Sequence, residues 1–496
     1  MRNNRVLMIA VWMIMITAFL GSGACRTQKA ADIPDAAIRD AVIRSLQDDD
    51  VVSPHRIDVQ VLNGVVAFSG FVSSMLEKEQ AVRVAESIKG VKAIIDHCRV
   101  RPVERTDEEI KQDIVQALKN NLVTATQALD ITVQNSAVTI TGTVGSWQEK
   151  EASINVVKSV QGIASLTEHV AIQYETERTE DEIVPEIKQR LAYDPYINED
   201  LISVEIDNST VTLHGTVGSR FEKKRIIARS YVYGVYDVVA DRVTVYPRLN
   251  DPMKKKSYQQ HVGDKDIRTA LILAFSYDPY VDSGDITVSV ADGVVRLSGT
   301  VEHRRSKHAA VKNAYNTLGV TRVTDEIAVR PPDLYTDTQI TDTVTMLIRL
   351  DAILERFDLV VWSRNNNVYL NGTVDTFYEK KRAEQIADGV RGVVDVTNHI
   401  NVDYTVNKTT DREIFDAIRW HLSWNPLVDG EEIDVTVEDA TVLLSGSVSS
   451  WKERAAAVKS AFAGGAEQVK DRMVVMGWDA SSVDNDYTVL DSHIYF

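Results

Sequence analysis

One short phrase recurs six times along this chain, and its spacing restricts the fold more than any other feature. Apolar and polar residues alternate up to a glycine, as in "VTLHGTV" from residue 211 and "VRLSGTV" from residue 295. Four of the five spacings between these glycines are 72 to 74 residues, and the fifth is 84. A fixed period of this kind predicts six copies of one small unit rather than one large core. The repeat glycines are Gly70, Gly142, Gly215, Gly299, Gly372 and Gly446.

The phrase and the run before it predict a β-hairpin in each unit. Val211, Leu213 and Val217 share one face of an alternating strand, and a second alternating run precedes each phrase, as at 286–290. Asn, Asp and Gly residues lie between the two runs and tolerate the positive φ that tight turns require. The repeat glycine falls on the buried face, where we expect it to admit a close approach by the following helix.

Two helices are also predicted in each unit. In five copies Ser or Thr comes four residues after the repeat glycine and Glu three later, as Ser74 and Glu77 do. This is the capping-box pattern of a helix start, and only the fourth copy, "HRRS" from residue 303, departs from it. An earlier helix with apolar residues three and four apart precedes each hairpin. A second glycine is expected to cap the later helix before a third strand: Gly90, Gly162, Gly234, Gly319, Gly392 and Gly464.

These elements predict an α+β fold of six tandem α-β-β-α-β units, each a three-stranded sheet with two helices on one face. The polar stretch 248–262 contains a proline and three lysines and is expected to be a linker. This break favours two groups of three units, while a rigid superhelix and separate beads both stay open. Residues 478–496 are a C-terminal tail without an assigned role. The predicted units span 34–103, 105–174, 178–247, 263–332, 336–405 and 410–477.

The first 25 residues predict export from the cytoplasm. Arg2 and Arg5 precede the apolar run 6–20, which is short for a membrane span of about 20 residues. Small residues follow, so residues 1–24 are typical of a secretory signal peptide. Cys25 comes directly afterwards and resembles the lipidated residue of bacterial lipoproteins; ordinary cleavage nearby and an uncleaved anchor are the alternatives. The expected location is the periplasm, with anchoring to the outer membrane if Cys25 is lipidated.

The repeat resembles the BON (bacterial OsmY and nodulation) domain family. The repeat length, the central glycine between apolar strand positions and a later Gly-Val pair, as at Gly90 and Gly234, carry this resemblance. It implies an envelope protein, often periplasmic, that is not an enzyme. It also implies a proposed ability to bind phospholipid membranes and a link to osmotic stress.

Two groups of residues are candidates for contact with a membrane or a protein partner. The first stands five positions after the repeat glycine, at the start of the second helix: Met75, Trp147, Phe377 and Trp451, with Arg220 and Arg304 in the other copies. The second lies beside a turn-forming proline after the first helix: Tyr193, Tyr196, Tyr277, Tyr280 and Trp424. Such residues insert into bilayer interfaces or bind partners. The alternative is that they pack within their own unit or against the next.

No catalytic, metal or cofactor site is predicted. Three histidines share one repeat position, but equivalent positions of tandem units lie too far apart to share a metal ion; they are His97, His169 and His399. Cys98 occupies an apolar strand position and is expected to be buried. The lysines at 254–256 are expected to keep the linker solvated, or else to touch anionic lipid. The sequence contains no phosphate-binding glycine loop, paired-cysteine motif or nucleophile elbow.

The expected function is non-catalytic attachment to phospholipid membranes of the envelope, in osmotic or envelope stress. Six weak sites on one chain would act together through avidity. The alternative is a periplasmic protein–protein scaffold or chaperone-like binder. The net charge of −17 slightly favours this alternative, because anionic headgroups repel an acidic surface, and it argues against nucleic-acid binding. No small-molecule substrate is expected, and the sequence sets neither the ligand nor the oligomeric state.

Overall fold

The hairpin and crossover predicted for each unit are present six times in a computed structural model of the chain. The structure describes residues 33–174, 178–247, 262–282, 284–332, 334–403 and 410–476. The predicted signal peptide, Cys25, the linker apart from Val262, and the tail lie outside the described residues. Contacts group the described residues from Pro34 onward into one compact unit. We number the six repeats as domains 1 to 6.

Domain 1 shows the order of elements that all six domains share. It contains α1 (Asp35–Gln47), a short 3-10 helix (Pro54–Arg56), β1 (Ile57–Leu62), β2 (Val65–Val72), α2 (Met75–Glu86) and β3 (Ala93–Val100). Strands β1 and β2 are antiparallel, and β3 pairs parallel to β2, so the sheet order is β1-β2-β3. A parallel neighbour needs a crossover, which α2 supplies. The α-β-β-α-β prediction is therefore confirmed.

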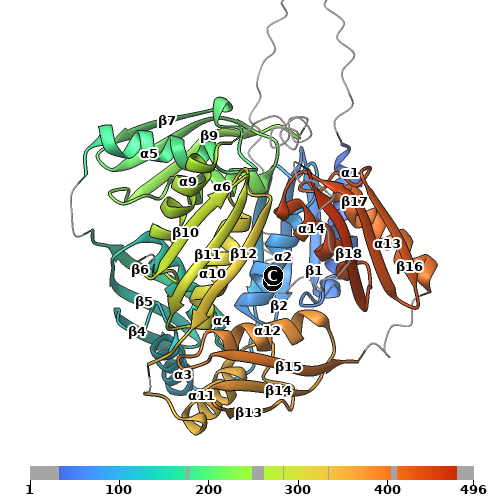
Figure 1. The fold of residues 1–496 in the computed structure, drawn as a ribbon. Helices are drawn as coiled ribbons and strands as arrows, with labels where there is room; N and C mark the ends of the chain where they lie inside the picture. The colour runs from blue at the N-terminus through green and yellow to red at the C-terminus, as the bar shows by residue number, and fades with distance from the viewer. Residues whose placement is uncertain are drawn as a thin grey trace, which may run out of the picture. The chain divides into compact units, whose positions relative to one another are not determined.

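The other domains repeat this order (Figure 1). Domain 2 contains α3 (Asp107–Asn120), β4 (Ala128–Gln134), β5 (Ala137–Val144), α4 (Trp147–Ser159) and β6 (Ser165–Ile172). Domain 3 contains α5 (Glu180–Ala192), β7 (Ile202–Asp207), β8 (Thr210–Val217), α6 (Arg220–Ser230) and β9 (Asp237–Val245). Domain 4 contains α9 (Asp264–Ser276), β10 (Ile286–Ala291), β11 (Val294–Val301), α10 (Arg304–Tyr315) and β12 (Arg322–Val329). Domain 5 contains α11 (Asp337–Leu350), β13 (Val360–Arg364), β14 (Asn367–Val374), α12 (Phe377–Asp388) and β15 (Asp395–Val402). Domain 6 contains α13 (Asp411–Trp424), β16 (Ile433–Glu438), β17 (Thr441–Val448), α14 (Trp451–Ala463) and β18 (Gln468–Val475).

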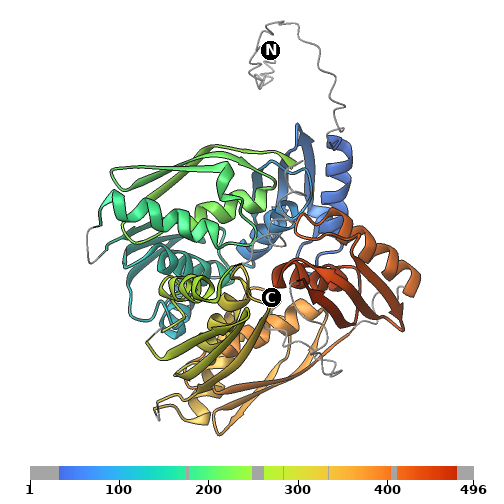
Figure 2. The same ribbon diagram turned by 45° about the horizontal axis from the view of Figure 1, so that its top comes forward.

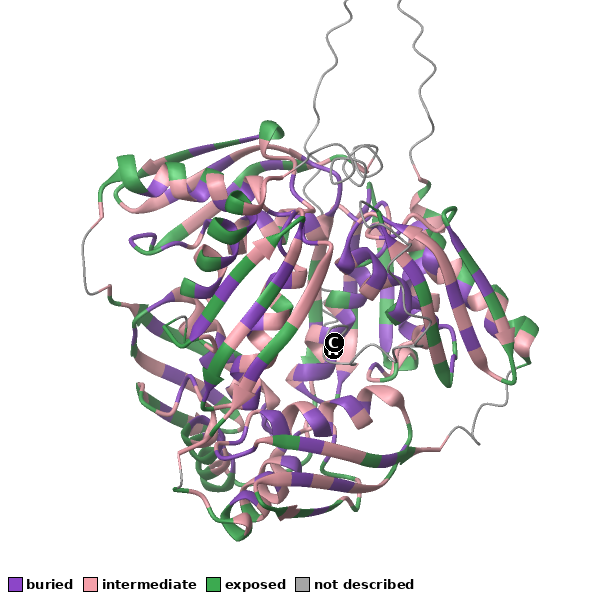
Figure 3. Cartoon of the chain, viewed as in Figure 1, coloured by how far each residue is buried: buried purple, intermediate pink, exposed green. Residues whose placement is uncertain are grey.

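Each domain has its own apolar core between its sheet and its two helices. In β2, Val66, Phe68 and Val72 are buried while the residues between them are more exposed. Figure 3 shows the same alternation of buried and more exposed residues along the strands of the other domains. Both helices lie on the buried face of each sheet (Figure 2). The opposite face of each sheet is therefore left without a helix from its own domain.

The hairpin turns take the conformation that their residues favour. Both central residues have positive φ, as Asn135 (51°) and Ser136 (61°) do, and this matches the twist of the paired strands. The carboxylate of Asp107, at the start of α3, accepts both turn N–H groups, at 2.8 and 2.9 Å. Five domains share this contact between helix start and hairpin, through Asp35, Asp107, Asp264, Asp337 and Asp411.

The repeat glycine is required by the chain before the first strand, so the expectation of an approaching helix is wrong. Gly70 has a φ of +119° and pairs with Ile57 across the hairpin. A side chain at Gly70 would overlap the backbone carbonyl oxygen of Arg56. Because an L-residue rarely adopts this φ, only glycine fits here without strain. The same carbonyl contact occurs in four other domains, at Gly142, Gly215, Gly299 and Gly446, while Gly372 meets a leucine side chain most closely.

The second glycine does not cap the later helix in most domains, which also corrects the prediction. Helix α2 ends with Ser87 as its C-cap, and Gly90 follows in a turn with a φ of +93°. In domain 3, a Cβ at Gly234 would lie 2.9 Å from the Ile183 side chain at the start of the first helix. This glycine therefore brings the turn against the first helix of its own domain. Only Gly464 is itself a C-cap among the six predicted positions, with a φ of −82°.

The predicted cap at the start of the second helix is confirmed, and its glutamate does more than cap. The Ser74 side chain accepts from the Glu77 N–H at 3.0 Å. The Glu77 carboxylate accepts from the N–H of Ser73 at 2.6 Å and from that of Ser53 at 2.8 Å. It thereby ties the start of α2 to the loop before β1. Glu379 completes the full capping box with Thr376 in domain 5.

Gly299→Ala should destabilise domain 4 by about 2 kcal/mol or more, because its φ is +131° and a side chain would overlap the Asp285 carbonyl. Gly263→Ala is the control in the same domain, since Gly263 has a φ of −69° and its Cβ would meet only an Asp266 oxygen at 3.6 Å. Urea unfolding of both variants measures the difference. Equal losses of stability would contradict the role given to the repeat glycine.

Candidate functional site

The residues five positions after the repeat glycine lie at contacts between domains. The Trp147 ring stacks on Tyr231 of domain 3, with ring centroids 4.5 Å apart and planes 5° from parallel. Phe377 stacks on Phe462 of domain 6 in the same way, at 4.2 Å. Met75 packs against the core of domain 2. These side chains are each covered in part by a domain other than their own.

Trp451 is the most enclosed member of this group, with 7% of its surface exposed. It joins the core of domain 6, its ring centroid lies 4.5 Å from that of Tyr315 in domain 4, and its Nε1–H donates to the Thr321 carbonyl at 3.2 Å. The two arginines at the same repeat position also reach other domains. Arg220 lies 3.6 Å from a carboxylate oxygen of Glu86 in domain 1, and Arg304 pairs with Asp388 in domain 5.

These six contacts have a cyclic order. Domain 1 reaches domain 2 through Met75, domain 2 reaches domain 3 through Trp147, and domain 3 returns to domain 1 through Arg220. Domains 4, 5 and 6 repeat the cycle through residues 304, 377 and 451. The chain thus forms two sets of three domains, divided where the sequence predicts the linker.

A second type of contact joins the two sets. The residue before the second glycine donates its backbone N–H to a carbonyl at the end of a first helix in another domain. Domain 1 donates to domain 6, domain 2 donates to domain 5, and domain 4 donates to domain 3. Because the same backbone hydrogen bond recurs three times, these three contacts are copies of one type of interface. The hydrogen bonds are Lys89 to Trp424 (2.9 Å), Gln161 to Leu350 (3.2 Å) and Leu318 to Tyr193 (3.1 Å).

The second aromatic group also lies at contacts between the two sets of domains. Tyr277 of domain 4 is buried, donates its hydroxyl to the Glu186 carboxylate and accepts from the Tyr233 N–H at 3.2 Å. The Tyr196 hydroxyl bonds to Ser450 of domain 6. Tyr193 and Trp424 supply two of the carbonyls described above.

Asp194, beside this group, is a buried charge that the sequence did not single out. Its carboxylate accepts from Arg225 Nε at 2.6 Å and from Arg229 Nε at 2.8 Å. Burial acts to raise the pKa of Asp194, but the two guanidinium groups overcome it and hold the pKa at about 2. The available signal was the phrase "YDPY", which domains 3 and 4 share; the sequence analysis singled out its tyrosines and its turn-forming proline but not its aspartate.

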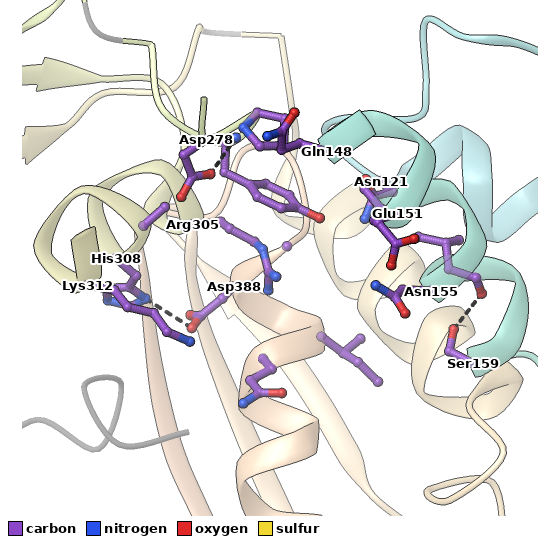
Figure 4. A pocket seen from close by; sticks show the side chains of 18 of the residues that line it. Asn121, Gln148, Glu151, Asn155, Ser159, Asp278, Arg305, His308, Lys312 and Asp388 are labelled. Carbon is purple, nitrogen blue, oxygen red and sulfur yellow. Dashed lines mark hydrogen bonds and ion pairs between the residues drawn. The ribbon is translucent and has the colours of Figure 1, made fainter. Parts of the chain in front are cut away.

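A cavity of about 850 Å³ lies where domains 2 to 6 meet (Figure 4). Its basic lining residues are Arg190, Arg225, Arg229, Arg305, Lys312, Lys381, Arg382 and Lys452. Its acidic lining residues are Glu151, Asp278, Asp351, Glu384 and Asp388. Tyr280, the remaining aromatic candidate, lines this cavity with its ring 4.4 Å from the Arg305 guanidinium. The second helices contribute most of these charges, from the sides that face away from their own sheets.

The remaining candidates from the sequence do not gather into a site. His97, His169 and His399 lie on the separate sheets of domains 1, 2 and 5. Within the described ranges, no group of three or more His, Cys, Asp or Glu side chains is arranged to hold a metal ion. Cys98 is buried, as expected, and burial raises the pKa of its thiol to about 11. None of the helices described is both long and apolar enough to cross a membrane.

Trp451→Ala should lower the stability of the protein by about 3–5 kcal/mol, because it empties space in the core of domain 6 and beside Tyr315. Trp362→Ala is the matched control, since Trp362 is 43% exposed and contacts mainly Tyr369 of its own sheet; it should cost about 1 kcal/mol. Chemical unfolding followed by fluorescence measures both. Similar losses of stability in the two variants would contradict a structural role for Trp451 between domains.

Comparison with known proteins identifies the repeat. The sequence model of the BON domain matches residues 34–102, 106–174, 179–247, 263–331, 336–404 and 410–477. Osmotically-inducible protein Y of Escherichia coli (strain K12) is 35% identical over 126 residues, which are 24% of this chain and 63% of that protein. This chain therefore spans less than two thirds of that relative's length.

Two solved chains of CdsD, a structural protein of the type III secretion system of Chlamydia trachomatis, also align, each with 12% identity. They cover 45% and 46% of this chain and 98% and 100% of their own, with TM-scores of 0.13 and 0.12. Likeness at this level supports no argument about the present fold. The six matches to the family model cover most of the sequence, and the chain belongs to the BON-domain family.

Proposed function

We propose that this chain is a non-catalytic binding protein of the cell envelope that acts in osmotic or envelope stress. Six BON domains support this, together with an E. coli relative whose name records osmotic induction. The N-terminal sequence, which resembles an export signal ending at Cys25, supports a location outside the cytoplasm. Lipidation of Cys25 would then attach the protein to the outer membrane.

The binding surface that the geometry favours is the open face of the sheets, and the partner is an envelope protein. Trp147, Phe377 and Trp451 contact other domains, so inserting them into a bilayer would require those domains to separate. The open face of domain 5, in contrast, carries Val360 and Trp362 on β13, which are 57% and 43% exposed. This observation carries the proposal of a periplasmic scaffold or chaperone-like binder.

The neighbours of Trp362 suit a protein partner. Its ring stacks on that of Tyr369 with centroids 3.8 Å apart, and Tyr369 pairs with Thr397 on β15. Across the same face Asn371 pairs with His399. An aromatic pair beside side chains that donate and accept hydrogen bonds is the composition of protein interfaces.

Binding to phospholipid surfaces is the second candidate. Exposed Val360 and Trp362 are also residues that enter a bilayer interface, and the resemblance to the family implies membrane binding. On this structure such binding would use the open face of domain 5.

A photo-crosslinking residue placed at position 362 in living cells should join the protein to envelope proteins, and the same residue at buried position 451 should not. In parallel, the chain from Arg26 onward, which carries no lipid, should stay at the bottom of a flotation gradient with anionic or zwitterionic vesicles. Flotation that Trp362→Ala abolishes would replace the scaffold with a phospholipid-binding function. Absence of both crosslinks and flotation would contradict the assignment of this face.

A further inference from the structure

The cavity where domains 2 to 6 meet gathers positive charge in a chain that is acidic overall. The whole chain has 55 Lys and Arg against 72 Asp and Glu. The cavity lining reverses this balance, with eight Lys and Arg against five Asp and Glu. Two of those acids already bind lining cations, since Asp351 lies 2.7 Å from Arg382 and Glu384 lies 2.8 Å from Lys381. The excess of three positive charges is therefore concentrated on the other cations.

Aromatic rings hold several of these other cations. Lys452 Nζ lies 4.7 Å from the Phe221 ring centroid, and the guanidinium groups of Arg305 and Arg190 lie 4.4 and 4.1 Å from tyrosine rings. A ring attracts a cation without neutralising its charge. These side chains therefore present a positive field to the cavity.

The arginine pair on α6, already counted among the eight lining cations, contributes part of this field. Arg225 and Arg229 share the single carboxylate of Asp194, so the trio carries one net positive charge. Arg225 Nη2 is buried and has no hydrogen-bond partner within the described part of the chain. A buried guanidinium N–H without an acceptor costs free energy, and an anionic oxygen from a ligand would satisfy it.

Burial, and to a smaller extent repulsion among the cations, lowers the pKa values of two lysines in the lining. Burial lowers the pKa of Lys452 well below its usual range, and the positive charges of Arg225, Lys312 and Arg229 lower it further against the opposing effect of Asp194. Burial also lowers the pKa of Lys312, with Arg305 contributing. Like charges confined together destabilise the folded state, and a bound anion would relieve that cost.

We propose that this cavity binds a small, soluble, multiply charged phosphate compound. Its volume of about 850 Å³ is within the range of roughly 300–1,000 Å³ for small-ligand sites. Arginine and lysine are the side chains that bind phosphate oxygens, and the arginine fork binds two at once. Figure 4 shows Arg305 and Lys312 on one wall, with Glu151 and Asn155 on the wall opposite. This site is separate from the open sheet face used in the proposed function, and the proposal adds a bound ligand where the sequence led us to expect no small-molecule substrate.

The test is isothermal titration of the chain from Arg26 onward with inorganic tripolyphosphate, at low and moderate salt. We expect saturable binding of one ligand per chain, weaker at higher salt, and a rise in Tm that grows with ligand concentration. Lys452→Met and Arg305→Met, which keep the aliphatic part of each side chain, should each weaken binding at least about tenfold. Lys265→Met and Arg39→Met change exposed cations outside the lining and should leave the affinity as it is.

The ligand-free melting temperature keeps the test independent of folding. Because Lys452→Met removes a cation from a crowded cluster, the variant without ligand should be at least as stable as the wild type, while the ligand-induced rise in Tm is lost. Binding to phosphatidylglycerol vesicles that Lys452→Met abolishes, without binding of tripolyphosphate, would assign the cavity to a lipid headgroup and overturn the proposal. So would affinity for tripolyphosphate that neither cavity variant changes, or the absence of any binding.

Discussion

The arrangement of the six domains depends on one side chain in each, at the first turn of the second helix. This position is a thioether, an indole, a phenyl ring or a guanidinium, and in every domain it contacts another domain. The pairs are chemically distinct, since an arginine facing Asp388 cannot replace a phenylalanine facing Phe462. Substitutions at a single repeat position thus specify which domain meets which, with mismatched pairs excluded by unpaired charge or lost packing.

The second helices therefore have two packed sides. One side covers the sheet of its own domain, and the other meets the second helices and turns of neighbouring domains. Charged residues on that outer side become cavity lining, which explains how a chain with a net charge of −17 encloses a basic interior. The sheets keep their open faces, so the proposed contact with a partner falls to side chains such as Trp362. Assembly and the proposed partner binding would thus use opposite sides of each domain.

The sequence was sufficient for features that act within one repeat. The period, the hairpin turns at Asn135 and Ser136 and the cap at Ser74 depend on residues close together, so a pattern reveals them. The close approach at Gly70 was misjudged because nothing local distinguishes a helix from a carbonyl as the neighbour. Contacts between domains could not be predicted from the repeat pattern, since the residues that meet are distant in the sequence; Tyr196 and Ser450 are 254 residues apart. Arg225 and Lys452 follow ordinary helical spacing on a polar face, which typically indicates solvent exposure, yet both line the cavity where several domains meet.

Small-angle X-ray scattering of residues 34–476 tests most directly whether the six domains pack together into one compact particle. A compact chain of this length has a radius of gyration of about 22 Å, and the account predicts a value close to this with the scattering profile of a single folded body. Arg304→Glu, which places a second carboxylate beside that of Asp388, should then separate domains 4 and 5 and raise the radius of gyration. A wild-type radius well above the compact value, with the profile of separate domains joined by flexible links, would contradict the account.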